Sequence, residues 1–180
     1  MYRYIAFLRA INVGGHNVRM IELCNLFTHA GYSNVASFIA SGNIIFDSNE
    51  PNTNELETQI QNMLQVSLGY NVATFIRTPI ELEYITNYKP FAEPIIAESN
   101  ALNIAFLHII LDESARIKLE SLKTDIDDFH IHQREIYWSC KKKQSESTIS
   151  NAVFEKTLRM QSALRGLNTI RKLAELTQNS

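Results

Sequence analysis

The beginning of the chain carries an apolar strand pattern followed by an amphipathic helix pattern. Residues 2–11 are rich in β-branched and aromatic side chains, interrupted only by Arg3 and Arg9. This pattern predicts a strand that is buried on both faces and lies centrally in its sheet. Over residues 20–30, apolar side chains recur at i, i+3, i+4, i+7 and i+10, the spacing of one helical face. Gly31 is placed to end that helix.

Further elements follow at short intervals. Ser41-Gly42 is a turn-forming pair between two short runs of strand character, which predicts a hairpin. Asn52, with Glu55 three residues later, resembles a capping box at the start of a second amphipathic helix. The predicted strands of this region are 34–40, 43–48 and 72–77. The resulting order, β-α-β-β-α-β, is the ferredoxin-like pattern.

The second half repeats this order less clearly. Ile5-Ala6-Phe7-Leu8 returns unchanged as Ile104-Ala105-Phe106-Leu107, and each copy opens a similar run of predicted elements. The second run comprises a strand at 102–111, a helix capped by Asp112, strands at 128–132 and 135–140, a helix at 150–159, a weakly indicated strand at 160–164 and a helix at 168–177. We therefore predict an α+β fold of two tandem ferredoxin-like units from an internal duplication, the second incomplete or modified, with an extra C-terminal helix.

A connecting segment separates the two predicted units. Thr78-Pro79 opens a short helix that runs to about Tyr88, and the proline-containing run 89–94 breaks it. The predicted organisation is a first subdomain at 1–78, a connecting segment at 79–100, and a second subdomain with the C-terminal helix at 101–180.

Composition is that of an ordinary globular protein. The 180 residues are 45% hydrophobic with a net charge of -2, which suits a buried core and gives no overall attraction to nucleic acid or acidic lipid. Residues 101–180 hold twelve Lys/Arg against ten Asp/Glu, whereas residues 1–100 hold five against nine. The only cysteines are Cys24 and Cys140, and no signal sequence or membrane-spanning apolar run is present. We expect a reduced, cytoplasmic protein that does not enter membranes.

Three stretches of the chain stand out as motifs: residues 4–15 (YIAFLRAINVGG), residues 39–46 (IASGNIIF), and residues 165–169 (RGLNT) with Lys172-Leu173. They resemble the signature stretches of the bacterial domain of unknown function family 1697 (DUF1697). Gly166 and Leu167 depart from that family, which usually has Asn and Trp there, and residues 141–146 replace its usual Pro-x-Gly turn. The resemblance implies a tandem ferredoxin-like fold and brings no established activity.

The predicted topology brings one group of polar and glycine residues to a single corner. Strand three of a ferredoxin-like unit lies antiparallel beside strand one, so the end of strand one meets the hairpin turn. An arginine, backbone N–H groups and a helix N-terminus together favour a small anion such as a phosphate or carboxylate. In the structural alternative, which stays open, the glycines only supply positive φ values and the asparagines satisfy backbone groups. The candidate ligand-binding residues are Arg9, Asn12, Gly14, Gly15, Asn17, Ser41, Gly42 and Asn43.

Other chemical candidates are weaker. His130 and His132 are two apart on a strand, but no third ligand has convincing spacing, so we predict no metal and no cofactor. Cys140 ends a strand beside three lysines, which would lower its pKa, yet no partner base is evident. The acidic residues of 125–128 predict a solvated turn. No Walker loop, serine-hydrolase elbow or full dinucleotide-binding glycine set is present, so no catalytic role is assigned.

Two rival classes remain beside the binding of a small anionic ligand. RNA-recognition modules stack bases on aromatic residues of strands one and three, where this chain has Phe7 and Phe46. The acidic first half argues against nucleic acid, although the lysines at 141–143 would suit phosphates. The other rival is a protein-interaction module that uses its sheets as pairing surfaces, and the oligomeric state is left open.

Overall fold

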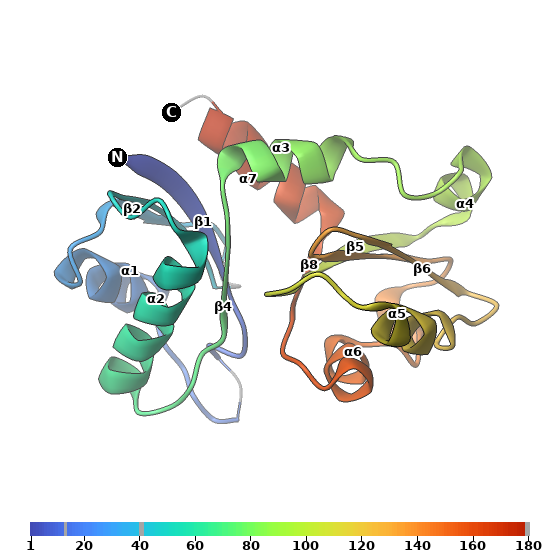
Figure 1. Ribbon diagram of the computed structural model, residues 1–180, viewed down its shortest axis with the longest axis horizontal. Helices are drawn as coiled ribbons and strands as arrows, with labels where there is room; N and C mark the ends of the chain where they lie inside the picture. Colours follow the sequence, from blue (N-terminus) through green and yellow to red (C-terminus); the bar gives the residue numbers. More distant parts are fainter. Residues whose placement is uncertain (13, 40–41, 179–180) are drawn as a thin grey trace. The chain divides into compact units, whose positions relative to one another are not determined.

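The computed structural model describes residues 1–12, 14–39 and 42–178, and the chain divides into two compact units. Unit 1 comprises Met1–Glu83 and Leu173–Ser180, and unit 2 comprises Tyr84–Lys172. Each contains one four-stranded antiparallel sheet with helices, a mixed α+β architecture (Figure 1). The finer division predicted at residues 78 and 100 stays a prediction. No helix in the described ranges is both long and apolar enough to cross a membrane.

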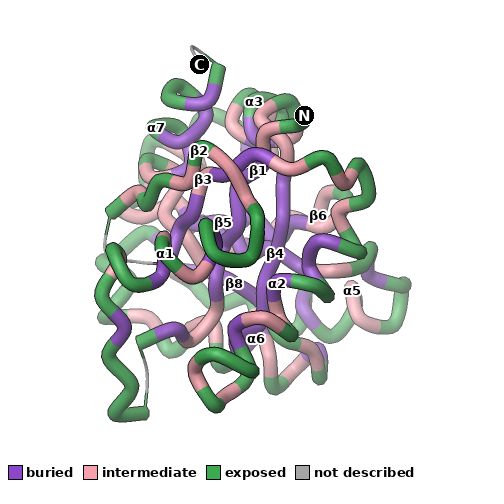
Figure 2. The backbone as a smooth tube through the Cα atoms, turned by 90° about the vertical axis from the view of Figure 1, so that its left-hand side faces the viewer, coloured by how far each residue is buried: buried purple, intermediate pink, exposed green. Residues whose placement is uncertain are grey.

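Unit 1 contains the predicted β-α-β-β-α-β order. Its strands lie in the order β2-β3-β1-β4, with all neighbours antiparallel. Helices α1 and α2 cover one face, where Leu23, Phe27, Leu56 and Ile60 pack against side chains of the sheet (Figure 1). Strands β1, β3 and β4 are mostly buried, whereas β2 and most of the connections are exposed (Figure 2). The elements are β1 (Tyr2–Leu8), α1 (Met20–His29), β2 (Ser33–Ser37), β3 (Asn43–Ser48), α2 (Thr53–Leu68) and β4 (Thr74–Arg77).

The first two strands of unit 1 end earlier than their sequence patterns predict. Strand β1 ends at Leu8 because the chain turns at Ala10, which has a φ of 63°. Ile11 is nevertheless buried, because it packs into the helix-side core. The apolar residue Ile11, beyond the end of β1, therefore belongs to a loop that packs on the core and not to the strand. Strand β2 ends at Ser37, and Ala40, the predicted end, lies outside the described residues.

Unit 2 contains a complete set of the same six elements, in the strand order β6-β7-β5-β8. Of the two alternatives predicted for this unit, incomplete or modified, the first does not hold, because all six elements are present. Strand β8 was only hinted at because it is short and holds Arg165 and Gly166, which do not form an apolar strand pattern. Helices α3 and α7 contribute residues to both units. The remaining elements are α3 (Pro79–Asn87), α4 (Glu93–Glu98), β5 (Ala101–Phe106), α5 (Glu113–Glu120), β6 (Asp127–His132), β7 (Glu135–Cys140), a 3-10 turn (Gln144–Glu146), α6 (Asn151–Leu158), β8 (Ala163–Gly166) and α7 (Leu167–Gln178).

The repeated tetrapeptide occupies the same register in both sheets. Ile5 of β1 lies opposite Arg77 of β4, and Ile104 of β5 lies opposite Arg165 of β8. Each arginine donates Nη1 to the carbonyl of the residue before it, at 2.7 Å and 2.9 Å. The two copies of the tetrapeptide thus hold equivalent places in their sheets.

Candidate functional site

The predicted meeting of the β1 end with the turn before β3 is present in unit 1. The N–H of Leu8 donates to the carbonyl of Gly42 (2.8 Å). Gly42 has a φ of 71°, and a Cβ at this position would lie 2.9 Å from Cγ2 of Ile11 and 3.3 Å from Cβ of Leu8. Both its backbone conformation and its crowded surroundings therefore require glycine. Ser41, the other predicted turn residue, lies outside the described residues.

The loop between β1 and α1 is anchored at both of its ends. The side chain of Asn12 accepts from the N–H of Val18 (2.6 Å) and donates to the carbonyl of the same residue (3.4 Å). Tyr70, between α2 and β4, donates its hydroxyl to the carbonyl of Ile11 (2.8 Å) and stacks on His16 with ring centroids 3.7 Å apart. The amide of Asn12 is therefore engaged with the backbone of its own loop.

Gly14 and Gly15 form the exposed part of this loop. Their φ values are 70° and 90°, and a Cβ at either position would meet nothing within 4 Å. Glycine is needed here for backbone conformation alone, in contrast to the crowded turn before β3. Asn17, also a predicted ligand contact, is exposed beside them. These three residues present backbone and one amide side chain at the surface.

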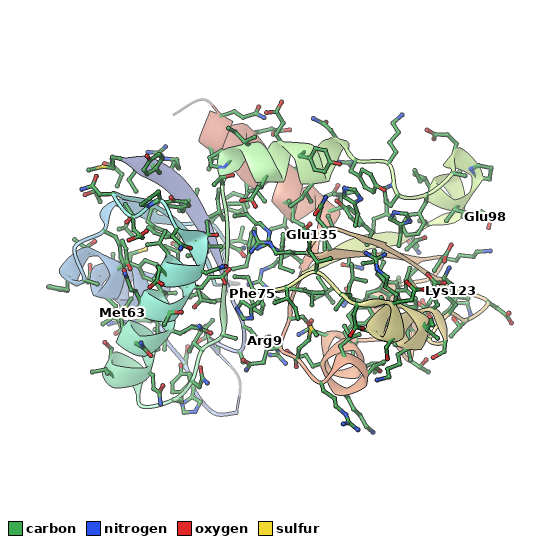
Figure 3. The ribbon with its side chains drawn as sticks, viewed as in Figure 1. Arg9, Met63, Phe75, Glu98, Lys123 and Glu135 are labelled. Atoms are coloured by element: carbon green, nitrogen blue, oxygen red, sulfur yellow. The ribbon has the colours of Figure 1, made fainter. Side chains whose placement is uncertain are left out.

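Arg9 lies on the face of the sheet opposite the two helices of unit 1. Leu8 packs into the helix-side core, and the N–H of Arg9 still pairs with the carbonyl of Ala73 (2.8 Å). Because consecutive strand residues alternate, Arg9 extends from the other face. Figure 3 shows Arg9 and Phe75 on the side of the sheet away from Met63 of α2. Arg9 is therefore at the predicted corner but does not extend toward the start of α1.

Asn43 and the N-terminus of α1 are engaged within the protein. Asn43 is fully buried and donates Nδ2 to the carbonyl of Phe38 (3.2 Å). At the start of α1, Glu22 accepts from the N–H of Arg19 (3.3 Å) and from its guanidinium (2.6 Å). These hydrogen bonds from Arg19 lower the pKa of Glu22. An internal carboxylate thus already complements this helix dipole.

The equivalent corner of unit 2 is built differently. The N–H of Leu107 donates to the carbonyl of Arg134 (2.9 Å), the counterpart of the bond that ends β1. The chain then enters α5 directly, where Asp112 caps the helix by accepting from the N–H of Ala115 (2.7 Å). In the hairpin, Gln133 adopts a φ of 51° without being glycine. This corner carries no loop comparable to that between β1 and α1.

The predicted histidine pair binds tyrosine hydroxyl groups. Nε2 of His132 lies 2.8 Å from the hydroxyl of Tyr84, and Nε2 of His130 lies 2.8 Å from that of Tyr88. Burial lowers the pKa of His130, and the positive charge of protonated His132 lowers it further. Among the described residues, no group of three or more His, Cys, Asp or Glu side chains is arranged to hold a metal ion.

Two other predictions for unit 2 are wrong. Burial raises the pKa of the Cys140 thiol, whereas the neighbouring lysines were expected to lower it. The solvated turn predicted for the acidic residues of 125–128 is wrong for Asp127, which is buried, whereas Asp125 is exposed in the bend before β6. Asp127 accepts hydrogen bonds from Trp138 Nε1 (2.8 Å), Ser147 Oγ (2.9 Å) and Thr124 Oγ1 (2.8 Å). This buried carboxylate therefore links Trp138 of β7 to Thr124 before β6 and to Ser147 after β7.

Phe7 and Phe46, the aromatic residues considered for RNA binding, lie on opposite faces of the sheet. Phe46 packs in the helix-side core, with its ring centroid 5.7 Å from that of Tyr4 and 5.5 Å from that of Phe27. Phe7, which precedes the core residue Leu8, points to the opposite face. Base stacking by an RNA-recognition sheet needs both aromatic residues on one open face. Phe7 and Phe46 do not have that arrangement.

A cavity of about 400 Å³ lies in unit 2, and sequence reasoning missed it. Its lining comes from residues 86–96, strands β5 and β7, and the first turns of α7. Leu167, one of the two departures from the DUF1697 motif, is part of this lining. Leu167 and Arg171 lie one turn apart on α7, which begins one residue before the predicted helix at 168–177. No pattern indicated that this helix approaches the segment after α3.

A protein-family model described as "Protein of unknown function (DUF1697)" matches residues 1–137. The chain belongs to this family. The resemblance inferred from residues 4–15 and 39–46 is confirmed, while the third stretch, at 165–169, lies beyond the matched residues. No curated protein matches this DUF1697 chain.

A solved structure has a similar fold. The conserved bacterial protein SP0830 from Streptococcus pneumoniae is 22% identical, with a TM-score of 0.78 and coverage of 99% of each chain. At this identity the likeness shows the fold alone. It supports the mixed α+β arrangement over the whole length of this DUF1697 protein.

Proposed function

We propose that this DUF1697 protein binds a small anionic ligand, a phosphate or a carboxylate, at the loop between β1 and α1. The observation that carries the proposal is the pair of exposed glycines, Gly14 and Gly15, held at positive φ in a loop anchored by Asn12 and Tyr70. Backbone N–H groups in such a loop can approach an anion closely, because no side chain intervenes. Anchoring lowers the entropy lost when the ligand binds.

The predicted residues take different roles in this site. Arg9 lies on the face of the sheet away from α1 and adds positive charge near the loop through its electrostatic field, and Asn17 offers hydrogen bonds from an exposed amide. Asn12 and Asn43 act indirectly, since their side chains hold the loop and the turn. Gly42 allows the close approach of Ile11.

We also propose that both units are ferredoxin-like and derive from one duplicated ancestor. The element order, the strand order and the register of the repeated tetrapeptide support this. Arg77 and Arg165 add an independent point, because their equivalent side chains make the same backbone contact. Under this proposal, the loop between β1 and α1 is a later specialisation of one copy.

Thermal denaturation with inorganic phosphate, glucose 6-phosphate and citrate tests the anion site. We expect at least one of these anions to raise the melting temperature in a saturable way. Arg9→Ala should reduce this rise, and Gly14→Asn should also reduce it, because asparagine tolerates positive φ but covers the backbone with a side chain. Lys118→Ala, which removes one exposed positive charge from α5, is the matched control. The proposal fails if no anion stabilises the protein or if Arg9→Ala leaves the effect unchanged.

A further inference from the structure

The cavity of unit 2 has the size of a small-ligand site, about 400 Å³. Leu102 and Ile104 of β5 and Tyr137 of β7 belong to its lining. These three side chains leave the same face of the sheet, because Ile104 lies opposite Tyr137 and Leu102 is two residues away. They form an apolar floor. All the lining residues belong to unit 2, so the cavity is a feature of that unit alone.

The aromatic walls of this cavity are held in place before any ligand arrives. The hydroxyl of Tyr88 lies 2.8 Å from Nε2 of His130, and its ring stacks on His132 with centroids 4.1 Å apart. Tyr137 donates its hydroxyl to the carbonyl of Ile85 (3.3 Å). Because both hydroxyl groups are engaged, the two tyrosines offer mainly ring surface. Such preformed walls reduce the ordering cost of binding.

The charges of the lining favour an anion. Leu167 and Arg171 are one turn apart on the same side of α7, so a guanidinium lies beside the apolar lining. Lys89 adds a second positive charge, and Glu93 is the one acidic residue of the lining. The Lys89–Glu93 pair is long, at 3.8 Å, and both side chains are about four-fifths exposed (79% and 81%). Such a pair is weak, which leaves Lys89 available to a ligand.

We propose that this cavity binds a small carboxylate that carries an aromatic ring. The ring lies on the floor formed by Ile104 and Tyr137, and the carboxylate faces Arg171. A planar guanidinium matches a carboxylate through two parallel hydrogen bonds, and the ring removes apolar surface from water. This ligand differs from the one proposed for the loop between β1 and α1, where the exposed residues offer no apolar floor. The two proposals therefore stand independently.

Equilibrium dialysis of the full chain with 4-biphenylacetate and its neutral amide tests the proposal. We expect saturable binding of the acid and binding of the amide weaker by about tenfold or more. Arg171→Ala should lower the affinity for the acid to that for the amide, and it should leave the affinity for the amide unchanged. Lys172→Ala is the matched control, because it removes an exposed positive charge from the next position of α7 but does not line the cavity.

A second variant tests the location of the bound ring. Leu167→Trp places a larger side chain in the cavity and should abolish binding of both the acid and the amide. Circular dichroism of this variant establishes that its secondary structure is retained. Lys118→Ala, which removes an exposed positive charge outside both proposed sites, should leave acid binding unchanged. The proposal is overturned if the acid shows no saturable binding, or if Arg171→Ala does not change its affinity.

Discussion

The corner after β1 and the corner after β5 begin with the same four residues and then diverge. In both, a leucine N–H closes the strand on the neighbouring hairpin, from Leu8 to Gly42 and from Leu107 to Arg134. Unit 1 then inserts an exposed glycine loop before α1, whereas unit 2 enters α5 almost at once through the cap at Asp112. Core packing fixes the position and register of β1 and β5, because the side chains of the repeated tetrapeptide are buried in both. The connection is free of that constraint and can acquire a binding role.

The units also differ in where polar groups are buried. Unit 2 ties its core together through Asp127, which accepts from Trp138, Ser147 and Thr124. Unit 1 has an ion pair instead, in which the largely buried carboxylate of Asp47 pairs with the partly exposed Arg3 at 2.8 Å. The first arrangement depends on a buried network and the second on a partly solvated pair.

Asp127→Ala should have the largest effect on stability, about 3 kcal/mol, since it leaves several buried donors without a partner. Asp47→Ala should cost only about 1 kcal/mol, because the Arg3–Asp47 pair is partly solvated. Urea denaturation followed by the fluorescence of Trp138 and by circular dichroism measures both variants. Equal losses would contradict the difference in burial between the two networks.

Gly42→Ala should cost about 2 kcal/mol, from left-handed backbone strain and from the clash with Ile11. Gly14→Ala is the matched variant, because it has nearly the same φ but open space, and should cost about 1 kcal/mol from strain alone. Thermal denaturation compares them. If Gly14→Ala proves the more damaging, the assignment of crowding to the turn before β3 is wrong.

Gln133→Gly should stabilise unit 2 by up to about 1 kcal/mol. A non-glycine residue at a φ of 51° is strained, and relief of that strain exceeds the added freedom of glycine in the unfolded chain. Urea midpoints of this variant and of the wild type provide the measurement. A loss of stability would mean that the Gln133 side chain makes a contribution larger than its backbone strain.

The pH dependence of unit 2 should contain a small contribution from His130. Burial and the charge of His132 lower the pKa of His130 in the folded state, so the unfolded chain binds its proton more readily. Stability is therefore complete above the ordinary histidine pKa of about 6.5 and declines as the pH falls below it, by less than about 1 kcal/mol for this partly exposed group. Trp138 fluorescence in urea, at pH values from about 7.5 to 5, measures this slope. His130→Phe should flatten it, and an unchanged slope would exclude His130 as its source.

Sequence patterns predicted the order of elements because amphipathic periodicity reports local burial. Helix α1 and strand β3 lie where their apolar spacing placed them. Strand β8 was shifted, since a four-residue strand with Arg165 and Gly166 is defined by its pairing with β5 rather than by its composition. Local spacing carries no information on such pairing.

The candidate site was predicted only in part, for a related physical reason. Topology correctly brought the β1 end to Gly42, but the alternation after Leu8 sends Arg9 to the face away from α1. That orientation could have been deduced from the sequence, because successive side chains of a strand point to opposite faces of the sheet. The cavity of unit 2 could not, because residues 86–96 and Arg171 meet only through the tertiary structure.

Backbone amide NMR during a phosphate titration tests the central claim, that unit 1 carries an anion site that its counterpart lacks. We expect saturable shifts of the Gly14, Gly15 and Asn17 resonances, which weaken in Arg9→Ala, with no comparable shifts at residues 107–112. Equal shifts at both corners, or shifts at the glycine loop that Arg9→Ala leaves unchanged, would contradict it.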